Sequence, residues 1–149
     1  MQIFLGILSL VAALNSWAAD ESTVLVAKIV EGALEVRKAG GPPVPLTKDA
    51  QVGKGQQVRG SKGSFAILVA ADGSRVKLEG ETVLEVIDFG NVRSFKLDKG
   101  MGMFQAAPGP ARSFQVRTRS AVMGVRGTQF FVSYAPTGGD EWMCVKEGE

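Results

Sequence analysis

Residues 64–78, SFAILVAADGSRVKL, decide the fold class of this chain. Residues 64–70 are nearly all apolar, which is typical of a short strand buried on both faces. Asp72 and Gly73 follow, and an Asp-Gly pair between two such runs predicts a tight reversal of the chain. Residues 75–78 alternate polar and apolar side chains, as a half-buried strand does. The stretch therefore predicts two β-strands joined by a turn.

The same pattern extends in both directions along the chain. Further strand-like runs lie at residues 23–30, 33–38, 56–59, 81–89, 93–97, 100–104, 113–118, 128–134 and 142–146. Glycine and proline separate them, and 19 glycines and 6 prolines are many for 149 residues. Apolar residues after the first segment never recur at helical spacing for three turns. We predict an all-β domain, either a short-strand β-sandwich or barrel or a β-solenoid-like domain.

The first segment has the features of a secretory signal peptide. Residues 3–14 (IFLGILSLVAAL) form an apolar run, and Ser16 and Ala18 form a small-x-small cleavage site after it. Asp20 is the first ionisable side chain. The run is shorter than the roughly 20 residues that a spanning helix needs. We predict a signal peptide at residues 1–18 and a single domain at residues 19–149, with no integral membrane segment. The domain is then periplasmic or secreted.

Composition excludes several classes of function. The chain has no histidine, which excludes Ser/His/Asp and Cys/His nucleophiles and histidine zinc sites. Its 17 basic and 15 acidic side chains are scattered, whereas nucleic-acid binding needs a clustered basic face. Most carboxylates alternate with apolar residues or adjoin glycine, as solvated ones do. We predict no enzyme activity, no cofactor and no nucleic-acid partner.

Sulfur-containing residues are expected in the core. Cys144 is the single cysteine and lies between Met143 and Val145, so we interpret it as a small buried hydrophobe. Methionine usually fills gaps in a core, and without histidine or a second cysteine a copper site is not expected. The methionines that this interpretation covers are Met101, Met103, Met123 and Met143.

The most distinctive motif lies in residues 120–132, SAVMGVRGTQFFV. Two glycines three residues apart indicate a backbone excursion that needs positive φ or close contact with a neighbouring strand. Arg126 between them is interpreted as a structural residue that bonds loop carbonyls or a carboxylate such as Glu147. A role in binding remains the alternative. The motif comprises Gly124, Val125, Arg126, Gly127 and Thr128.

These segments together resemble the FecR domain. The resemblance rests on residues 52–59 (VGKGQQVR), 65–78 (FAILVAADGSRVKL), 114–132 (FQVRTRSAVMGVRGTQFFV) and 145–149 (VKEGE). It implies a periplasmic all-β module; in the iron-citrate regulator of this family, the domain contacts an outer-membrane transporter and relays a signal to a sigma factor. This chain shows no cytoplasmic anti-sigma segment and stops where the family pattern continues into a further strand. A C-terminally truncated FecR-like domain is therefore expected.

Two functions remain after these exclusions. The first is a non-catalytic module that binds or scaffolds an envelope protein in signalling, through exposed strand edges and polar strand faces. The residues expected on that partner surface are Arg75, Lys77, Arg93, Lys96, Arg117 and Arg119. The second is an envelope protein that binds the cell wall or a polysaccharide through aromatic side chains. Trp142 and Tyr134 are its candidates, although both are expected in the core.

Overall fold

The computed structural model describes residues 24–90, 92–107, 113–126 and 129–147. Within these residues the chain consists of strands and turns, without a helix, which confirms the predicted all-β class. The predicted signal peptide at residues 1–18 lies outside the described residues, as do Gly127 and Thr128 of the distinctive motif.

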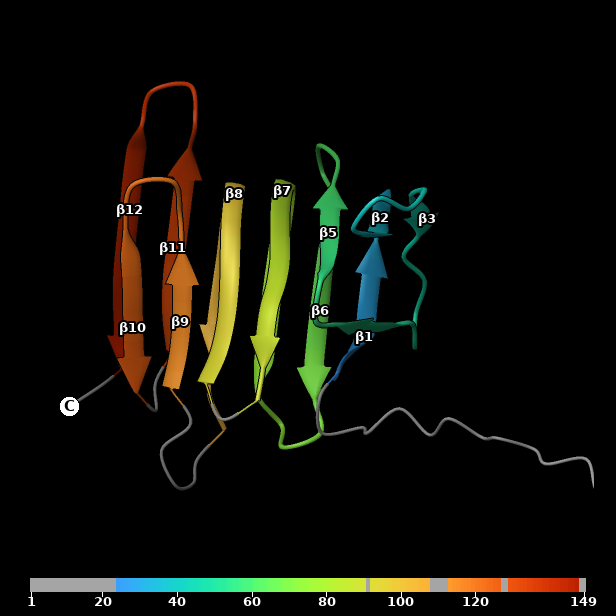
Figure 1. The fold of residues 1–149 in the computed structure, drawn as a ribbon, viewed down its shortest axis with the longest axis horizontal. Coiled ribbons are helices and arrows are strands. Elements are labelled where there is room, and N and C mark those ends of the chain that lie inside the picture. The colour runs from blue at the N-terminus through green and yellow to red at the C-terminus, as the bar shows by residue number, and fades with distance from the viewer. Residues whose placement is uncertain (1–23, 91, 108–112, 127–128, 148–149) are drawn as a thin grey trace, which may run out of the picture.

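Twelve strands appear in the described residues (Figure 1). They are β1 (Val24–Glu31), β2 (Leu34–Lys38), β3 (Val44–Pro45), β4 (Gln51–Gly53), β5 (Gln56–Gly60), β6 (Phe65–Ala70), β7 (Arg75–Phe89), β8 (Val92–Gln105), β9 (Ser113–Arg117), β10 (Val122–Arg126), β11 (Gln129–Ala135) and β12 (Asp140–Glu147). The predicted hairpin is β6–β7, and its turn closes with a hydrogen bond from Gly73 N to the Ala70 carbonyl at 2.9 Å.

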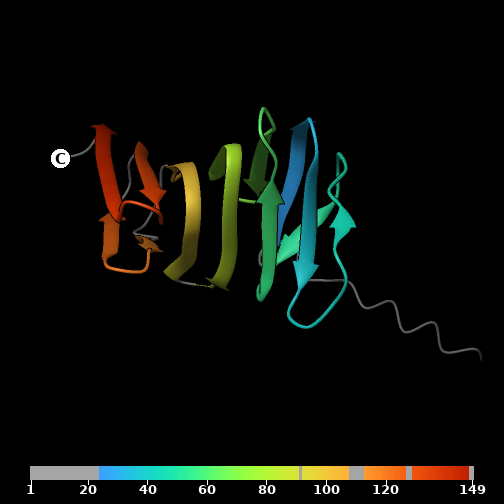
Figure 2. The ribbon, with the colours of Figure 1, turned by 90° about the horizontal axis from the view of Figure 1, so that it is seen from above.

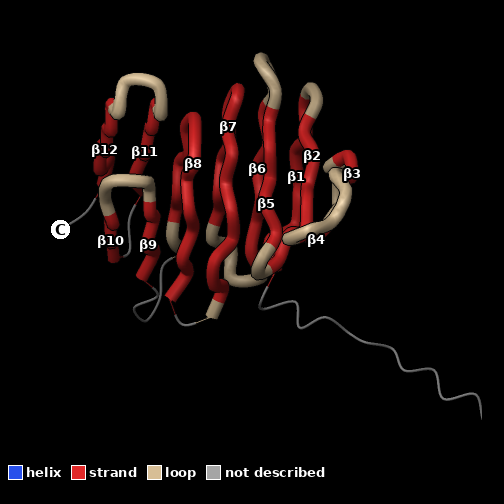
Figure 3. Tube along the Cα trace, turned by 45° about the horizontal axis from the view of Figure 1, so that its top comes forward, coloured by secondary structure: helices blue, strands red, loops and turns tan. Residues whose placement is uncertain are grey.

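The strands form one continuous sheet that folds over on itself into two layers. A front layer has the order β10-β9-β8-β7-β5-β2-β3, and a back layer has the order β12-β11-β8-β7-β6-β1-β4. Figures 1 and 3 show β9 and β10 in front of β11 and β12. Neighbouring strands are antiparallel except β8 and β9, which are parallel. In the turned view of Figure 2, β11 and β12 form one row and β9 and β10 form another.

Two long strands hold the layers together. The first part of β7 pairs with β6 in the back layer, and its second part pairs with β5 in the front layer. The first part of β8 pairs with β9, and its second part pairs with β11. Sequence analysis predicted two separate strands in each of these regions. Each pair is instead one long strand of 15 or 14 residues that belongs to both layers.

The sheet bends from one layer into the other at Gly80 of β7 and Gly100 of β8, and we call this bend the crease. Gly80 and Gly100 have φ of 67° and 95°, and the β7–β8 register shifts between Glu79 and Val83. Thr82 stabilises the crease, because its buried hydroxyl donates a hydrogen bond to the Glu79 carbonyl at 2.7 Å and accepts one from Met101 N at 3.1 Å. Glycine therefore marks a sharp bend inside a strand here, rather than the gap between two strands.

The core lies between the two layers and is aromatic in its centre. Phe95 and Phe114 stack with ring centroids 5.9 Å apart, and Phe104 and Phe130 stack at 5.2 Å. Phe95 also makes a tilted contact with Phe104 at 5.3 Å and an edge-on contact with Phe89 at 6.2 Å. These rings come from β7, β8, β9 and β11, so they bind both layers together around the crease.

Candidate binding surface

The outer face of the front layer is polar. Strand registers place five residues in one row across it: Arg117, Lys96, Glu85, Gln57 and Arg37. All five are exposed or half-buried, and the buried residues of the same strands alternate with them. This face has the charged and mixed character of an ordinary solvated surface.

The outer face of the back layer is different, because apolar side chains dominate it. One register row runs Ile29, Ile67, Lys77, Met103, Phe131 and Cys144, from β1 to β12. A neighbouring row runs Phe65, Glu79, Met101, Ser133 and Trp142. We call the apolar members of this surface the apolar face: Val26, Ile29, Phe65, Ile67, Val69, Met101, Met103, Phe131, Trp142 and Cys144.

Several of these side chains are well exposed. The exposed fraction is 64% for Trp142, 42% for Ile29 and 36% for Met101. Trp142 meets the ring of Phe131 edge-on, with centroids 6.4 Å apart. Scattered apolar residues are normal on a surface, whereas a contiguous apolar patch marks a site of interaction. The apolar face is therefore a candidate binding surface.

This face corrects the interpretation of β6. Residues 64–70 were expected to be buried on both sides of a sheet. In the structure Ala66, Leu68 and Ala70 are buried between the layers, while Phe65, Ile67 and Val69 face outward and are half-buried. The second apolar set is not covered by a third layer within the described residues. The uninterrupted apolar run of residues 64–70 was interpreted as core, whereas every second residue of it contributes to this candidate binding surface.

A narrow charged stripe crosses the apolar face. Arg75, Lys77 and Glu79 project outward from β7, between the apolar residues of β6 and those of β8. The ammonium of Lys77 lies 4.9 Å from the centre of the Phe65 ring, in a cation–π contact. Among the salt bridges of the described residues, none involves Arg75 or Lys77. Two positive charges therefore stand in the middle of the face.

The six residues predicted for a partner surface do not lie together. Arg75 and Lys77 lie on the apolar face of the back layer. Lys96 and Arg117 are register partners on the polar face of the front layer. Arg119 is exposed in the turn between β9 and β10. The structure thus distributes the predicted charges over both faces of the molecule.

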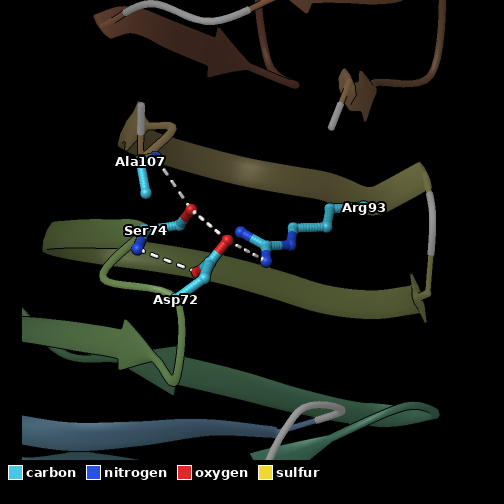
Figure 4. A network of polar contacts seen from close by, with 4 residues as sticks. All are labelled: Asp72, Ser74, Arg93 and Ala107. Atoms are coloured by element: carbon cyan, nitrogen blue, oxygen red, sulfur yellow. Dashed lines mark hydrogen bonds and ion pairs between the residues drawn. The ribbon is translucent and has the colours of Figure 1, made fainter. Parts of the chain in front are cut away.

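Arg93, the sixth residue, is a correction, because its side chain is only 1% exposed. It lies in the core, with its guanidinium carbon 4.8 Å from the Phe89 ring centre and 5.6 Å from that of Phe114. It forms a hydrogen-bonded ion pair with Asp72 (Figure 4). Arg93 lies two and four residues before the buried Phe95 and Leu97 of β8, so strand alternation places it on the same inward side. That alternation could have predicted its burial from the sequence.

Asp72 is held by its own turn as well. Its carboxylate accepts hydrogen bonds from Ser74 N at 3.0 Å and Ser74 Oγ at 3.1 Å, and Ser74 Oγ accepts one from Ala107 N at 3.0 Å (Figure 4). Burial raises the pKa of Asp72, but the hydrogen bond from Arg93, that from Ser74 N and the charge of Arg93 outweigh it and lower the pKa below 3.8. The carboxylate is therefore ionised at neutral pH, and this network is structural.

Three further expectations about side chains were wrong. Trp142 and Cys144 were expected in the core, but both are exposed on β12. Met101 and Met103 were expected to fill the core and instead face outward on β8. Strand alternation explains these positions, because Phe104, Phe130 and Val132 occupy the inward positions of the same layer. The expectation for Tyr134 is confirmed, as it is 4% exposed.

The glycine motif lies at one edge of the front layer. Gly124 pairs with Gln115 and Val125 with Phe114 in the β9–β10 ladder. The expectation of a positive φ or a close strand contact at Gly124 is wrong. Its φ is not positive, and the nearest atom to an added Cβ would be the Phe114 carbonyl oxygen at 3.9 Å. Gly127, Thr128 and the predicted contact between Arg126 and Glu147 fall outside the described residues or side chains.

The described residues contain neither a metal-binding cluster nor a membrane-spanning helix. No group of three or more His, Cys, Asp or Glu side chains is placed to hold a metal ion in residues 24–90, 92–107, 113–126 and 129–147. The same stretches contain no helix that is long and apolar enough to cross a membrane. The strongest feature of the described surface remains the apolar face.

Comparison with known proteins places the chain in a family. The family model described as FecR protein matches residues 56–148, which is more than half of the chain. The chain belongs to the FecR protein family. No curated protein and no solved structure matches it. The FecR family is a regulatory and signalling family associated with the periplasmic side of the envelope, which agrees with the resemblance seen in the sequence.

The FecR match and the folded unit do not have the same bounds. The match runs from β5 to β12 and includes both layers at the crease. However, β1 pairs with β6 and β2 pairs with β5, so strands before residue 56 complete both layers. Ile29 and Val26 of β1 also extend the apolar face beyond the matched region. The sheet that contains the matched region therefore also includes strands that precede residue 56.

Proposed function

We propose that this FecR protein is a non-catalytic module of the cell envelope that binds a protein partner in signalling, through its apolar face. The observation that carries the proposal is the contrast between the two outer faces. One layer presents charged and polar side chains, whereas the other presents apolar side chains on both sides of the charged stripe of β7, with Trp142, Ile29 and Met101 exposed. Apolar surface of this extent is stabilised when a partner covers it.

The composition of the face suits a protein partner. Aromatic residues, methionine and arginine are enriched in protein interfaces, and this face contains Phe131, Trp142, Met101 and Met103 beside Arg75. Methionine adapts its shape to the surface that it meets. A partner with apolar residues and a carboxylate over Arg75 and Lys77 would complement the face. Binding is then expected to weaken as ionic strength rises.

The family supports the location and the kind of partner. FecR proteins act on the periplasmic side with envelope and receptor partners. Residues 1–18 have the pattern of a signal peptide, which would export residues 19–149 to that compartment. A regulatory role requires only that the domain bind and release its partner, and no catalytic group is needed for that.

In-cell crosslinking of the tagged full chain tests the proposal. Met101→Lys introduces a charge into the apolar face, and Lys96→Glu is the matched control on the polar face. We expect wild type and Lys96→Glu to capture the same envelope protein, identified by mass spectrometry, and Met101→Lys to lose it. Equal capture by wild type and both variants, or loss of capture only with Lys96→Glu, would contradict the proposal.

A second function is favoured by one observation. Trp142 is 64% exposed and lies against Phe131, and exposed aromatic surfaces of this kind also stack on sugar rings. The chain would then bind the cell wall or another polysaccharide. Co-sedimentation with purified cell wall separates the two functions. Binding that is lost in Trp142→Ala supports the polysaccharide function, and absence of co-sedimentation excludes it.

A further inference from the structure

A cavity lies at one end of the front layer, where β5, β2 and β3 are neighbours (Figure 1). It is open to solvent and has a volume of about 610 Å³. Small-molecule sites in proteins have volumes of roughly 300–1,000 Å³ and are lined mainly by apolar groups with a few polar ones. The cavity therefore has the size of a small-molecule site.

The apolar part of the cavity is preformed. Its lining includes Leu34, Pro43, Pro45 and Leu46. Leu46 N donates a hydrogen bond to the Leu34 carbonyl at 2.9 Å, and Ser61 N donates one to the Ala33 carbonyl at 3.0 Å, so main-chain bonds join the lining segments to one another. The proline rings also fix their own φ. A site that is already ordered loses less entropy when it binds a ligand.

Two opposite charges lie at this cavity. Glu35 of β2 and Arg59 of β5 both line it, and they are register partners in the antiparallel β2–β5 pair. Directly opposite residues in such a pair have Cβ atoms about 5 Å apart on the same side of the sheet. No salt bridge between described residues involves either side chain, and Arg59 Nη2 instead donates to Gln57 Oε1 at 3.3 Å. A carboxylate and a guanidinium thus stand side by side without neutralising each other.

Protection of the sheet edge explains only part of this arrangement. β3 contains two residues, and Pro43 and Pro45 lie in and beside it. Short strands and prolines are the usual means of blocking strand addition. That role requires neither a cavity nor two opposite charges beside it. The charges are therefore the feature that indicates a ligand.

We propose that this cavity binds a free α-amino acid with a large apolar side chain. The guanidinium of Arg59 donates two parallel hydrogen bonds to the α-carboxylate, and the carboxylate of Glu35 accepts hydrogen bonds from the α-ammonium. The apolar side chain of the ligand lies against the leucines and prolines of the lining, which removes apolar surface from water.

Charge complementarity selects this class of ligand. The ammonium and carboxylate of an α-amino acid are joined through one carbon atom, and Glu35 and Arg59 are neighbours in the same way. A simple carboxylic acid leaves Glu35 without a partner, and a simple amine leaves Arg59 without one. The main chain within a peptide carries neither charge. A free amino acid is therefore the ligand that satisfies both side chains.

Titration of the full chain with L-leucine, followed by amide NMR shifts, tests this inference. We expect saturable shifts in residues 33–35 and 59–61. Three related probes each lack one of the proposed contacts: N-acetyl-leucine has no ammonium, leucinamide has no carboxylate and glycine has no apolar side chain. Each should bind at least about tenfold more weakly than leucine, because a charge pair or the apolar contact is lost.

Two variants assign the contacts to residues. Glu35→Gln and Arg59→Gln should each weaken leucine by at least about tenfold. Glu85→Gln and Arg37→Gln are the matched controls, because they change the same charges on the same outer face away from this cavity and should bind as wild type does. Glu35→Gln should also bind N-acetyl-leucine about as well as leucine. A merely structural role of Glu35 would not remove that discrimination.

Four results would overturn the inference. They are the absence of saturable shifts up to the solubility limit of leucine, shifts confined to other residues, equal binding of leucine and N-acetyl-leucine by wild type, and unchanged leucine binding by Glu35→Gln and Arg59→Gln. The inference is independent of the proposed protein-binding function, which rests on the other layer. Met101→Lys should therefore bind leucine as wild type does, so each of the two proposals can fail without the other.

Discussion

Asp72 and Arg93 form an ion pair that joins the two layers across the core. Asp72 lies in the turn between β6 and β7 of the back layer, and Arg93 lies near the start of β8 in the front layer. The side chain of Arg93 is 1% exposed and that of Asp72 is 26% exposed. Arg93 Nε and Nη1 have no hydrogen-bond partner among the described residues, and the guanidinium lies beside the rings of Phe89 and Phe114. Within the described structure, the charge of Asp72 therefore compensates the buried guanidinium.

Removal of the charge of Asp72 should destabilise the protein strongly. Asp72→Asn leaves Arg93 buried without an anion, and we expect a loss of about 3 kcal/mol in the free energy of unfolding. Glu81→Gln is the control, because it breaks the exposed pair with Lys99 and should cost less than about 1 kcal/mol. Denaturant unfolding measures both. Similar losses for the two variants would show that the Asp72–Arg93 pair does not link the layers.

The same pair predicts a dependence of stability on acid. The pKa of Asp72 is lowered on folding, so the stability from this group is fully present above the ordinary pKa of an aspartate, 3.8. It is lost as pH falls through the lower folded value. We therefore expect the stability gap between wild type and Asp72→Asn to be constant near neutral pH and to shrink below about pH 4. A gap that is unchanged at pH 2 would contradict the assignment.

The crease in β8 should tolerate no side chain at Gly100. An added Cβ would lie 2.5 Å from Thr82 Oγ1 and 2.6 Å from the Glu81 carbonyl oxygen, at a φ of 95°. Gly100→Ala is expected to cost more than about 2 kcal/mol of stability. Gly55→Ala is the control, since its φ is 78° but nothing lies within 4 Å, and it should cost about 1 kcal/mol. Thermal or denaturant unfolding compares them, and equal costs would argue against a crowded crease.

Cys144 should react in the folded protein. Its side chain is exposed on β12, although its apolar neighbours in sequence suggested burial. We expect a maleimide to label the native full chain completely, without denaturant. The denatured chain provides the reference for one thiol per molecule. Labelling that requires unfolding would place Cys144 in the core and remove it from the apolar face.

Local patterns predicted most of the strands, because alternation and turn residues act over a few positions, but they missed β3, β4 and β10. The β6–β7 hairpin with its Asp72–Gly73 turn is a direct consequence of such a pattern. The crease was not predictable in the same way, since glycine at Gly80 or Gly100 reads equally as a turn or as a bend within a strand. Strands elsewhere in the sequence, β5, β9 and β11, determine whether the chain makes a turn or a bend at these glycines.

The candidate surface was predicted only in part. Arg75 and Lys77 were expected to face outward, and they stand at the centre of the apolar face. The apolar residues around them were assigned to the core, because an apolar run cannot by itself tell a covered face from an exposed one. Arg93 was placed outside because charge was given more weight than its parity with Phe95 and Leu97. Arg93 can be buried because the rings of Phe89 and Phe114 and the carboxylate of Asp72 lie against its guanidinium.

Site-specific photo-crosslinking in cells determines whether the partner binds to the apolar face. A photoreactive phenylalanine analogue at Met101 samples the apolar face of the full chain, and the same analogue at Lys96 samples the polar face. We expect the Met101 position to capture one envelope protein and the Lys96 position to capture none. Capture of the same protein from both positions, or from Lys96 alone, would contradict the claim that the apolar face is the binding surface.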